Sequence, residues 1–238
     1  MRYLKVLKWM GAGLLAAVLC GVLWVLGRGY WMYRSAVNEA PLAQKIEEIR
    51  QKPGFTPLSE LPSVYINGVV AVEDHRFYSH HGVDLFAIGR AAWNNLWAGR
   101  LAEGGSTITQ QLAKNLYFTQ EKRFERKIAE VFMAWLIEDS CTKREILELY
   151  VNAIYFGDGY TCVKDAAEGY FGKDPSELSF YEATMLVGIP NAPSAYAPTK
   201  SPELAAQRQA QVVQRMQKYG YLPPQRLSGG LRRGIAAP

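Results

Sequence analysis

An uncharged run of 19 residues, Trp9 to Gly27, most constrains what this chain can fold into. As an α-helix the run would span about 28 Å, close to the hydrocarbon thickness of a bilayer. Trp9 and Trp24 lie near its ends, where tryptophan favours the membrane interface. The alternatives are a cleaved signal peptide and a buried core helix. The run is longer than a usual signal core and no clear Ala-x-Ala site follows it, so we predict a retained single-span anchor.

The charges around this run predict its orientation. Arg2, Lys5 and Lys8 precede it, and no acidic residue occurs before Glu39. Because basic residues favour the cytoplasmic side, we expect a cytoplasmic amino terminus, with everything after Arg28 outside the cytoplasmic (inner) membrane. The predicted organisation is a cytoplasmic basic segment at 1–8, a transmembrane anchor at 9–27, a stalk or linker at 28–54, a globular domain at 55–222 and a tail at 223–238.

Charge and cysteine content exclude several classes of protein. The formal net charge is +5, but without those three amino-terminal cations 24 basic residues face 22 acidic ones. So small an excess, with no nucleic-acid-binding motif, argues against a nucleic-acid partner. Cys141 and Cys162 are 21 residues apart and could form a disulfide, whereas Cys20 lies in the apolar run. No Cys/His spacing typical of zinc occurs.

The rest of the chain reads as mainly α, since few windows alternate with period two. Expected helices run from Val64 to about Asp74, with Ser63 as the cap, and from Asp84 to about Trp97. A further helix follows the loop at 104–107, and others run from Phe124 to Asp139 and, behind a Thr142–Glu145 capping box, from Lys143 to Asn152. The last three run from Asp165 to Tyr170, from about Ser179 to Val187, and from Pro202 to about Tyr219. The prolines between Ile189 and Thr199 predict an extended loop.

Two of these helices have informative faces. The helix at 124–139 carries an apolar stripe that we expect to face the core: Phe124, Ile128, Val131, Phe132, Trp135 and Leu136. Arg123, Lys127, Glu130 and Ala134 share another face, which by itself is typical of a solvated surface. The helix at 84–97 is unusually aromatic. Core packing explains this equally well as immersion in a bilayer does.

The segment Val69–Gly82 carries the strongest candidate for chemistry. Four apolar residues run directly into Glu73 and Asp74, and His75, His80 and His81 follow. A carboxylate at the end of an apolar run is desolvated on one side, which suits proton transfer. The structural alternative is a helix end whose acid and imidazoles face water.

A second candidate is the loop at 104–107 and the helix that follows it. Glycines followed by Ser106 and Thr107 lead into a helix start, where hydroxyl and free N–H groups could meet an anion. Helical spacing places Thr107, Gln110 or Gln111, and Lys114 on neighbouring surface. The phosphate-loop signature is absent, so the pattern alone indicates a capped helix start with a bias towards sugar or phosphate recognition.

Six motifs occur in order between Leu61 and Met216: Glu73-Asp-x-x-Phe-x-x-His-x-Gly82, Gly105-Ser-Thr-Ile-Thr-Gln-Gln-Leu-x-Lys-Asn115, Arg126-Lys-x-x-Glu130, Lys143-x-x-Ile-Leu-Glu-x-Tyr-x-Asn152, Ala167-x-x-Tyr-Phe-Gly-Lys173 and Gly188-x-Pro-x-x-Pro-x-x-Tyr-x-Pro198. Each is a weak signal alone, but six in order behind an anchor are specific. Together they resemble the peptidoglycan glycosyltransferase family (glycosyltransferase family 51) in its monofunctional, membrane-anchored form.

The resemblance implies a lysozyme-like α-helical lobe and a smaller membrane-facing jaw lobe, with a cleft between them. It implies polymerisation of lipid II outside the cytoplasmic membrane, without a cross-linking transpeptidase domain. The expected partners are lipid II, the growing lipid-linked glycan chain and the membrane, with cell-wall synthesis proteins as further candidates. Cys162 and Lys164 depart from the family's glycine-rich fifth segment, so the contacts expected there do not carry over.

The resemblance also assigns roles to residues. Glu73 is the expected base for the GlcNAc 4-hydroxyl, which attacks the MurNAc anomeric carbon with inversion and forms a β-1,4 link. Glu130 is the second expected catalytic residue, which orients Lys127 or Arg126 or holds a divalent metal (Mg or Mn). No organic cofactor is expected, and the histidines become loop-fixing residues. The expected substrate-binding residues are Asp74, Phe77, Ser106, Thr107, Gln110, Gln111, Lys114, Asn115, Arg126 and Lys127, of which the three cations would meet the leaving undecaprenyl pyrophosphate.

Two rival functions follow from the same residues. A lysozyme-like lytic enzyme also needs one essential glutamate, but it has no use for a pyrophosphate site, so Lys114 and the 126–130 cluster favour synthesis. A non-catalytic scaffold for cell-wall assembly would need no intact set of acid and cations.

Overall fold

The computed structural model describes residues 2–100, 104–119 and 123–223, and the predicted tail from 224 onward lies outside them. Within these ranges the regular structure is helical apart from isolated bridges at 81–83 and 157–160, which confirms the mainly α prediction. The longer helices are α1 (Arg2–Glu39), α2 (Leu42–Arg50), α3 (Ser63–Glu73), α4 (Leu85–Ala98), α5 (Ile108–Tyr117), α6 (Phe124–Ser140), α7 (Lys143–Val151), α8 (Val163–Phe171), α9 (Phe180–Gly188) and α11 (Pro202–Lys218). The short turns are η1 (Leu58–Glu60), η2 (Phe77–Ser79), η3 (Pro175–Glu177), η4 (Ile189–Asn191) and α10 (Pro193–Tyr196).

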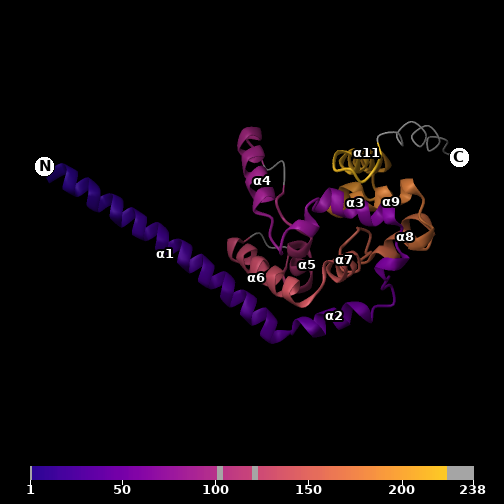
Figure 1. Cartoon of the computed structure of the whole chain (residues 1–238), viewed down its shortest axis with the longest axis horizontal. Helices are drawn as coiled ribbons and strands as arrows, with labels where there is room; N and C mark the ends of the chain where they lie inside the picture. Colours follow the sequence, from indigo (N-terminus) through magenta and orange to yellow (C-terminus); the bar gives the residue numbers. More distant parts are fainter. Residues whose placement is uncertain (1, 101–103, 120–122, 224–238) are drawn as a thin grey trace.

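Helix α1 contains the predicted anchor and continues well beyond it. Its part from Lys8 to Glu39 is long and apolar enough to cross a membrane, with a mean hydropathy of 2.2 over an 18-residue window that is not buried at all. Figure 1 shows the amino-terminal end of α1 reaching away from the other helices. A single helix therefore runs from the anchor into the folded body.

The carboxyl-terminal part of α1 packs against α6. Gly29 lies directly over Ile128, and the ring of Phe132 contacts Tyr30 and Tyr33 at centroid distances of 5.3 and 5.8 Å. Residues 28–54, expected as a stalk, are thus mostly helical and packed, and α2 buries Leu42 and Ile49 in the core. The sequence hides this because the apolar positions of α2 are separated by Gln, Lys and Glu.

Helix α3 lies at the centre of the fold, packed against α9 and α11 (Figure 1). Its apolar residues face several neighbours at once, and Gly68 allows close approach, because a Cβ there would lie 2.9 Å from Val187. The predicted Ser63 cap is wrong. Pro62 occupies the cap position in extended backbone and Ser63 is already the first helical residue, so its hydroxyl caps nothing.

The predicted core face of α6 is also wrong. The buried residues are Ala129, Glu130, Met133, Ala134 and Ile137, whereas Phe124 is 85% exposed. Helix α6 has neighbours on two sides, α1 and α5, and its bulky residues Ile128 and Phe132 meet α1. The mixed face with Glu130 therefore points inward, although charge alone suggested a solvated surface.

Three further predictions from local sequence have different outcomes. The Thr142–Glu145 capping box opens α7 as expected. Cys141 and Cys162 are both free thiols, so the disulfide left open by the sequence is not formed. The segment predicted as an extended loop over 189–199 contains η4 and α10 instead, because proline suits the first position of a helical turn.

Helix α4 stands apart from the body (Figure 1). Asp84 caps it by accepting hydrogen bonds from the backbone N–H groups of Phe86 and Ala87. Only Ala91 along the helix is buried, which excludes core packing as the reason for its aromatic content. Its exposed apolar side chains are Leu85, Phe86, Ile88, Trp93, Leu96 and Trp97.

Candidate active site

Glu73 is the last residue of α3, at the wall of a cavity of about 380 Å³. The side-chain amide of Gln111 donates a hydrogen bond to its Oε2 atom at 2.8 Å. Gln111 is itself oriented, because its Oε1 atom accepts from the hydroxyl of Tyr150 at 3.1 Å. Burial, together with the nearby Glu73 carboxylate, raises the pKa of Tyr150 well above its ordinary value, so this hydroxyl remains a donor. A fixed chain of donors thus holds the Glu73 carboxylate.

Asp74 and Phe77 were predicted to bind substrate, but neither lines the cavity. Asp74 is 7% exposed, and its Oδ2 atom accepts from His80 Nε2 at 2.9 Å and from the backbone N–H of Ile108 at 3.1 Å. Phe77 has no exposed surface. Asp74 therefore ties the loop after α3 to the first turn of α5.

Thr107 and Gln110, also predicted to bind substrate, do not line the cavity either. They form a capping box at the start of α5, and Thr107 also donates its hydroxyl hydrogen to the carbonyl of Gly82 at 2.6 Å. Both side chains are about 1% exposed, so neither can meet a ligand in this conformation. Gly82 itself has φ of +75° and lies against the backbone of Ala134, a position that only glycine occupies without strain.

Ser106, Gln111 and Lys114, which were predicted to bind substrate, line the cavity from the loop before α5 and from the partly exposed face of α5. Burial and the neighbouring Arg126 lower the pKa of Lys114, while Glu73 acts in the opposite direction. Lys114 therefore lies close enough to both groups to interact electrostatically. Asn115 is half-buried on the same helix and does not line this cavity.

Arg126, Lys127 and Glu130 form one ion cluster on α6. The Glu130 side chain is 2% exposed and pairs through Oε1 with Arg126 and through Oε2 with Lys127, the latter at 2.8 Å. Lys127 also donates to the Ser106 hydroxyl at 2.7 Å, which joins the cluster to the cavity wall. Burial, with Arg126 and Lys114 nearby, lowers the pKa of Lys127 to about 8. Glu130 thus orients both cations and offsets one of their two positive charges.

A protein-held metal does not fit Glu130. Both of its oxygens face cations, and the residues that the structure describes contain no cluster of three or more His, Cys, Asp or Glu side chains that could hold an ion. Two or more oxygen ligands from the protein would be expected for such a site.

The cavity contains five residues that sequence reasoning missed: His75, Arg90, Arg208, Arg215 and Tyr219. His75 was expected only to fix its loop, as His80 does through Asp74 and His81 through Asp139. Arg208 and Arg215 lie seven residues apart, two turns of one helix, a spacing that places both on one face of α11 and could have been noticed. Neither Arg90 nor Tyr219 carries any signal in the sequence alone.

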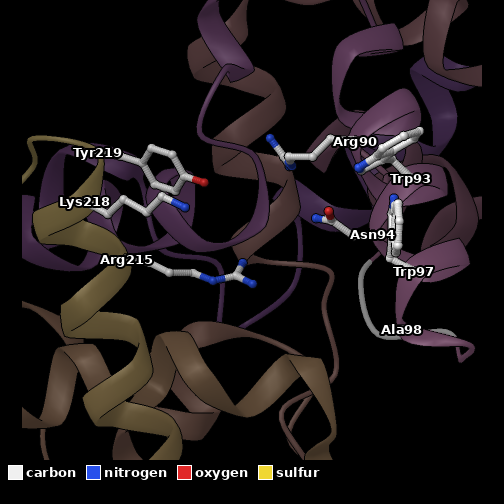
Figure 2. A pocket seen from close by; sticks show the side chains of 8 residues that line it. All are labelled: Arg90, Trp93, Asn94, Trp97, Ala98, Arg215, Lys218 and Tyr219. Atoms are coloured by element: carbon white, nitrogen blue, oxygen red, sulfur yellow. The ribbon is translucent and has the colours of Figure 1, made fainter.

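A second, more open cavity of about 860 Å³ adjoins the first between α4 and the end of α11. It shares Arg90, Arg215 and Tyr219 with the first cavity and adds Trp93, Asn94, Trp97, Ala98 and Lys218. Figure 2 shows Arg90 on one side, with Arg215, Lys218 and Tyr219 reaching towards it from the other. The two cavities make one long cleft with cations along it and Glu73 in its inner part.

A model of the family described as "Transglycosylase" matches residues 39–217, which is most of the chain. This chain belongs to the transglycosylase family. The family predicted from the six motifs is thereby confirmed.

Relatives of this transglycosylase include two kinds of protein. The penicillin-binding protein 1A of Aquifex aeolicus is 48% identical over 175 residues, which are 74% of this chain but 24% of that protein. A Cupriavidus necator protein named "Putative transglycosylase" is 41% identical over 197 residues, 83% of this chain and 85% of its own length. This chain therefore spans about a quarter of the penicillin-binding protein relatives and most of the second relative.

A solved structure of penicillin-binding protein 1A from Haemophilus influenzae aligns with 77% of this transglycosylase and 18% of that chain. Its TM-score is 0.46 at 23% sequence identity.

Proposed function

We propose that this transglycosylase polymerises lipid II into glycan strands with β-1,4 links, with Glu73 as the general base. The observation that carries the proposal is the single cleft in which a carboxylate held by Gln111 lies beside Lys114 and the ion cluster of α6. This cleft is supported by buried side chains that do not line it, namely Asp74, Phe77, Thr107 and Gln110.

The reaction that the family resemblance implies can be assigned to these groups. Glu73 takes the proton of the GlcNAc 4-hydroxyl of one lipid-linked substrate. That oxygen attacks the MurNAc anomeric carbon of the growing chain and inverts it. The bond from this carbon to the diphosphate breaks, and undecaprenyl pyrophosphate leaves with the bonding electrons. Gln111 donates to Oε2 and no described residue donates to Oε1, and we assign the proton to Oε1 on this ground.

The leaving diphosphate needs fixed positive charge. Lys114, Arg126 and Lys127 supply it on the α5–α6 side of the cleft. Charge placed in advance in a partly buried site stabilises a developing anion better than water does. Glu130 keeps the cations oriented but leaves the cluster with a net positive charge to offer.

The second lipid-linked substrate also carries a diphosphate. The α4–α11 cavity, with Arg90, Arg215 and Lys218, is a suitable place for it (Figure 2). The exposed apolar face of α4 adjoins this cavity and suits contact with lipid chains. We infer from the amino-terminal cations that the folded body lies outside the cytoplasmic membrane.

The proposed function is tested by incubating the protein separately with labelled lipid II and with finished glycan strands. Polymer from lipid II, and no fragments from strands, is the expected result, and the reverse would identify a lytic enzyme. Glu73→Gln should lower polymerisation about a hundredfold or more while leaving lipid II binding and melting temperature unchanged. No turnover of either substrate by the wild type would point to the non-catalytic scaffold.

We also propose that a divalent ion binds together with the substrate. Mg²⁺ commonly binds through substrate phosphates with few protein ligands, so an ion could accompany the diphosphate without a protein cage. Polymerisation in EDTA, followed by addition of Mg²⁺ or Mn²⁺, tests this.

A further inference from the structure

The end of α3 is held from α11 at two points on either side of Glu73. The Arg215 guanidinium donates a hydrogen bond from Nη1 to the carbonyl oxygen of Val72 at 2.8 Å. The imidazole of His75 stacks on the ring of Tyr219, with centroids 4.0 Å apart and an interplanar angle of 16°. Val72 immediately precedes Glu73 and His75 follows two residues later, so the two contacts bracket the glutamate.

Both holding groups belong to one rigid unit. Tyr219 ends α11 and its N–H donates to the carbonyl of Arg215 at 3.0 Å, so the two side chains emerge from successive turns of the same face. The next residue after Arg215, Met216, is fully buried and packs against α3 at Gly68. The bracket is therefore anchored by helix packing, which makes it a precise support.

The Arg215 contact meets a need of the helix itself. The last four carbonyl groups of an α-helix have no partner within it. In α3 the carbonyl of Val70 accepts from the Asp74 N–H, and that of Val72 accepts from Arg215, whose charge also suits a helix carboxyl terminus. The Glu73 carboxylate is held through Oε2 by Gln111. The direction of Oε1 therefore depends on the backbone at 72–75.

We propose that Arg215 and Tyr219 are positioning residues for Glu73, holding the backbone on both sides of the base so that its Oε1 atom faces the attacking hydroxyl. The proposal rests on the function proposed above, since it takes Glu73 as the base. Arg215 lines both cavities, and a guanidinium has five donors, so one side chain can hold Val72 and face an anion in the α4–α11 cavity (Figure 2). Substrate binding and orientation of the base are thus connected through Arg215.

The test separates kcat from KM in lipid II polymerisation by the full-length protein in detergent. Arg215→Ala should lower kcat about 10- to 100-fold, because a displacement of about 1 Å in a reacting group has effects of that size. Lys218→Ala removes a cation from the same cavity, where the ammonium lies 5.4 Å from the Tyr219 ring centroid, and should raise KM with a smaller fall in kcat than Arg215→Ala. Gln214→Ala, at an exposed neighbouring position of α11, is the matched control and should match the wild type in both constants.

A double substitution distinguishes positioning from a general loss of structure. In a Glu73→Gln background the base is absent, so Arg215→Ala should cause no further fall in kcat, whereas independent effects would multiply. Arg215→Lys keeps a charge and a donor and should recover part of kcat; it also provides the comparison if Arg215→Ala does not fold. Tyr219→Phe keeps the ring stacked on His75 and should retain more kcat than Tyr219→Ala.

The outcomes are distinct. If the wild type does not polymerise lipid II, the proposed function and this inference both fail. If the wild type is active and Arg215→Ala keeps its kcat, the inference alone is overturned. The same result follows if Arg215→Ala lowers kcat equally with and without the Glu73 carboxylate, since Arg215 would then act independently of the base.

Discussion

The contact between Gly29 of α1 and Ile128 of α6 predicts that the membrane helix controls the catalytic cations. A Cβ atom at Gly29 would lie 2.5 Å from Ile128 Cβ, 2.6 Å from its Cγ2 and 2.9 Å from the Glu125 carbonyl oxygen. One of these neighbours is backbone, so a rotamer change cannot relieve the contact. Gly29→Ala must therefore move α1 and α6 apart.

The size of the movement follows from these distances. Carbon atoms are in comfortable contact at roughly 3.5 Å or more, so the helices must separate by about 1 Å. Overpacking of this kind costs about 1–3 kcal/mol, from which the better helix propensity of alanine recovers about 1 kcal/mol. The free energy of unfolding should thus fall by about 0–2 kcal/mol. Arg126 and Lys127 immediately precede Ile128 on α6, and a displacement of these cations by about 1 Å should lower polymerisation about 10- to 100-fold.

The measurement is the rate of lipid II polymerisation beside a thermal melt in the same detergent. Gly27→Ala, in the same helix with nothing within 4 Å of its Cβ position, is the matched control and should keep full activity. Ile128→Ala keeps the Cβ atom at 2.5 Å and the Glu125 carbonyl at 2.9 Å, so adding it to Gly29→Ala should leave the rate low. If Gly29→Ala polymerises as fast as Gly27→Ala, the anchor is only a tether and the reasoning is wrong.

Three further predictions concern the site. Lys127 binds an anion only when protonated, and its pKa of about 8 means that kcat/KM should fall as pH rises through 8. Lys127→Arg should move this alkaline limb of the pH profile to higher pH, and identical profiles would show that Lys127 takes no part in the mechanism. Glu130→Gln removes the charge that both cations share, so the limb should move below that of the wild type in the same pH series. Asp74→Asn weakens the charged hydrogen bonds to His80 and Ile108, which should lower the free energy of unfolding by about 1.5–3 kcal/mol in a thermal melt. A change in KM without a change in melting temperature would show that Asp74 binds substrate.

The sequence predicted features whose causes are local. The uncharged run of α1, the capping box of α7 and the ends of most helices depend on residues within one or two turns, and they appear in the structure close to their expected bounds. Glu73 and Lys114 were likewise identified by motifs of a few residues each, and both line the cleft.

Features that depend on distant partners were missed. Composition could not show that α6 lies between α1 and α5, so its inner and outer faces were exchanged, and Glu130 looked solvated. Arg215 reaches a carbonyl 143 residues earlier in the chain, and no local pattern reports such a contact. Phe77 and Thr107 were predicted to contact a ligand because they belong to motifs. Both are buried, and they hold the loops from which neighbouring residues reach the cleft.

The exposed apolar face of α4 has a kinetic consequence. The α4–α11 cavity opens beside that face, so under the proposed function a lipid-linked sugar in the same bilayer would arrive by lateral diffusion without leaving the membrane. The relevant substrate concentration is then a number of molecules per unit area of membrane. Diluting lipid II with inert phospholipid at constant bulk concentration should therefore slow the enzyme, while diluting the vesicles in buffer should leave the initial rate per enzyme almost unchanged.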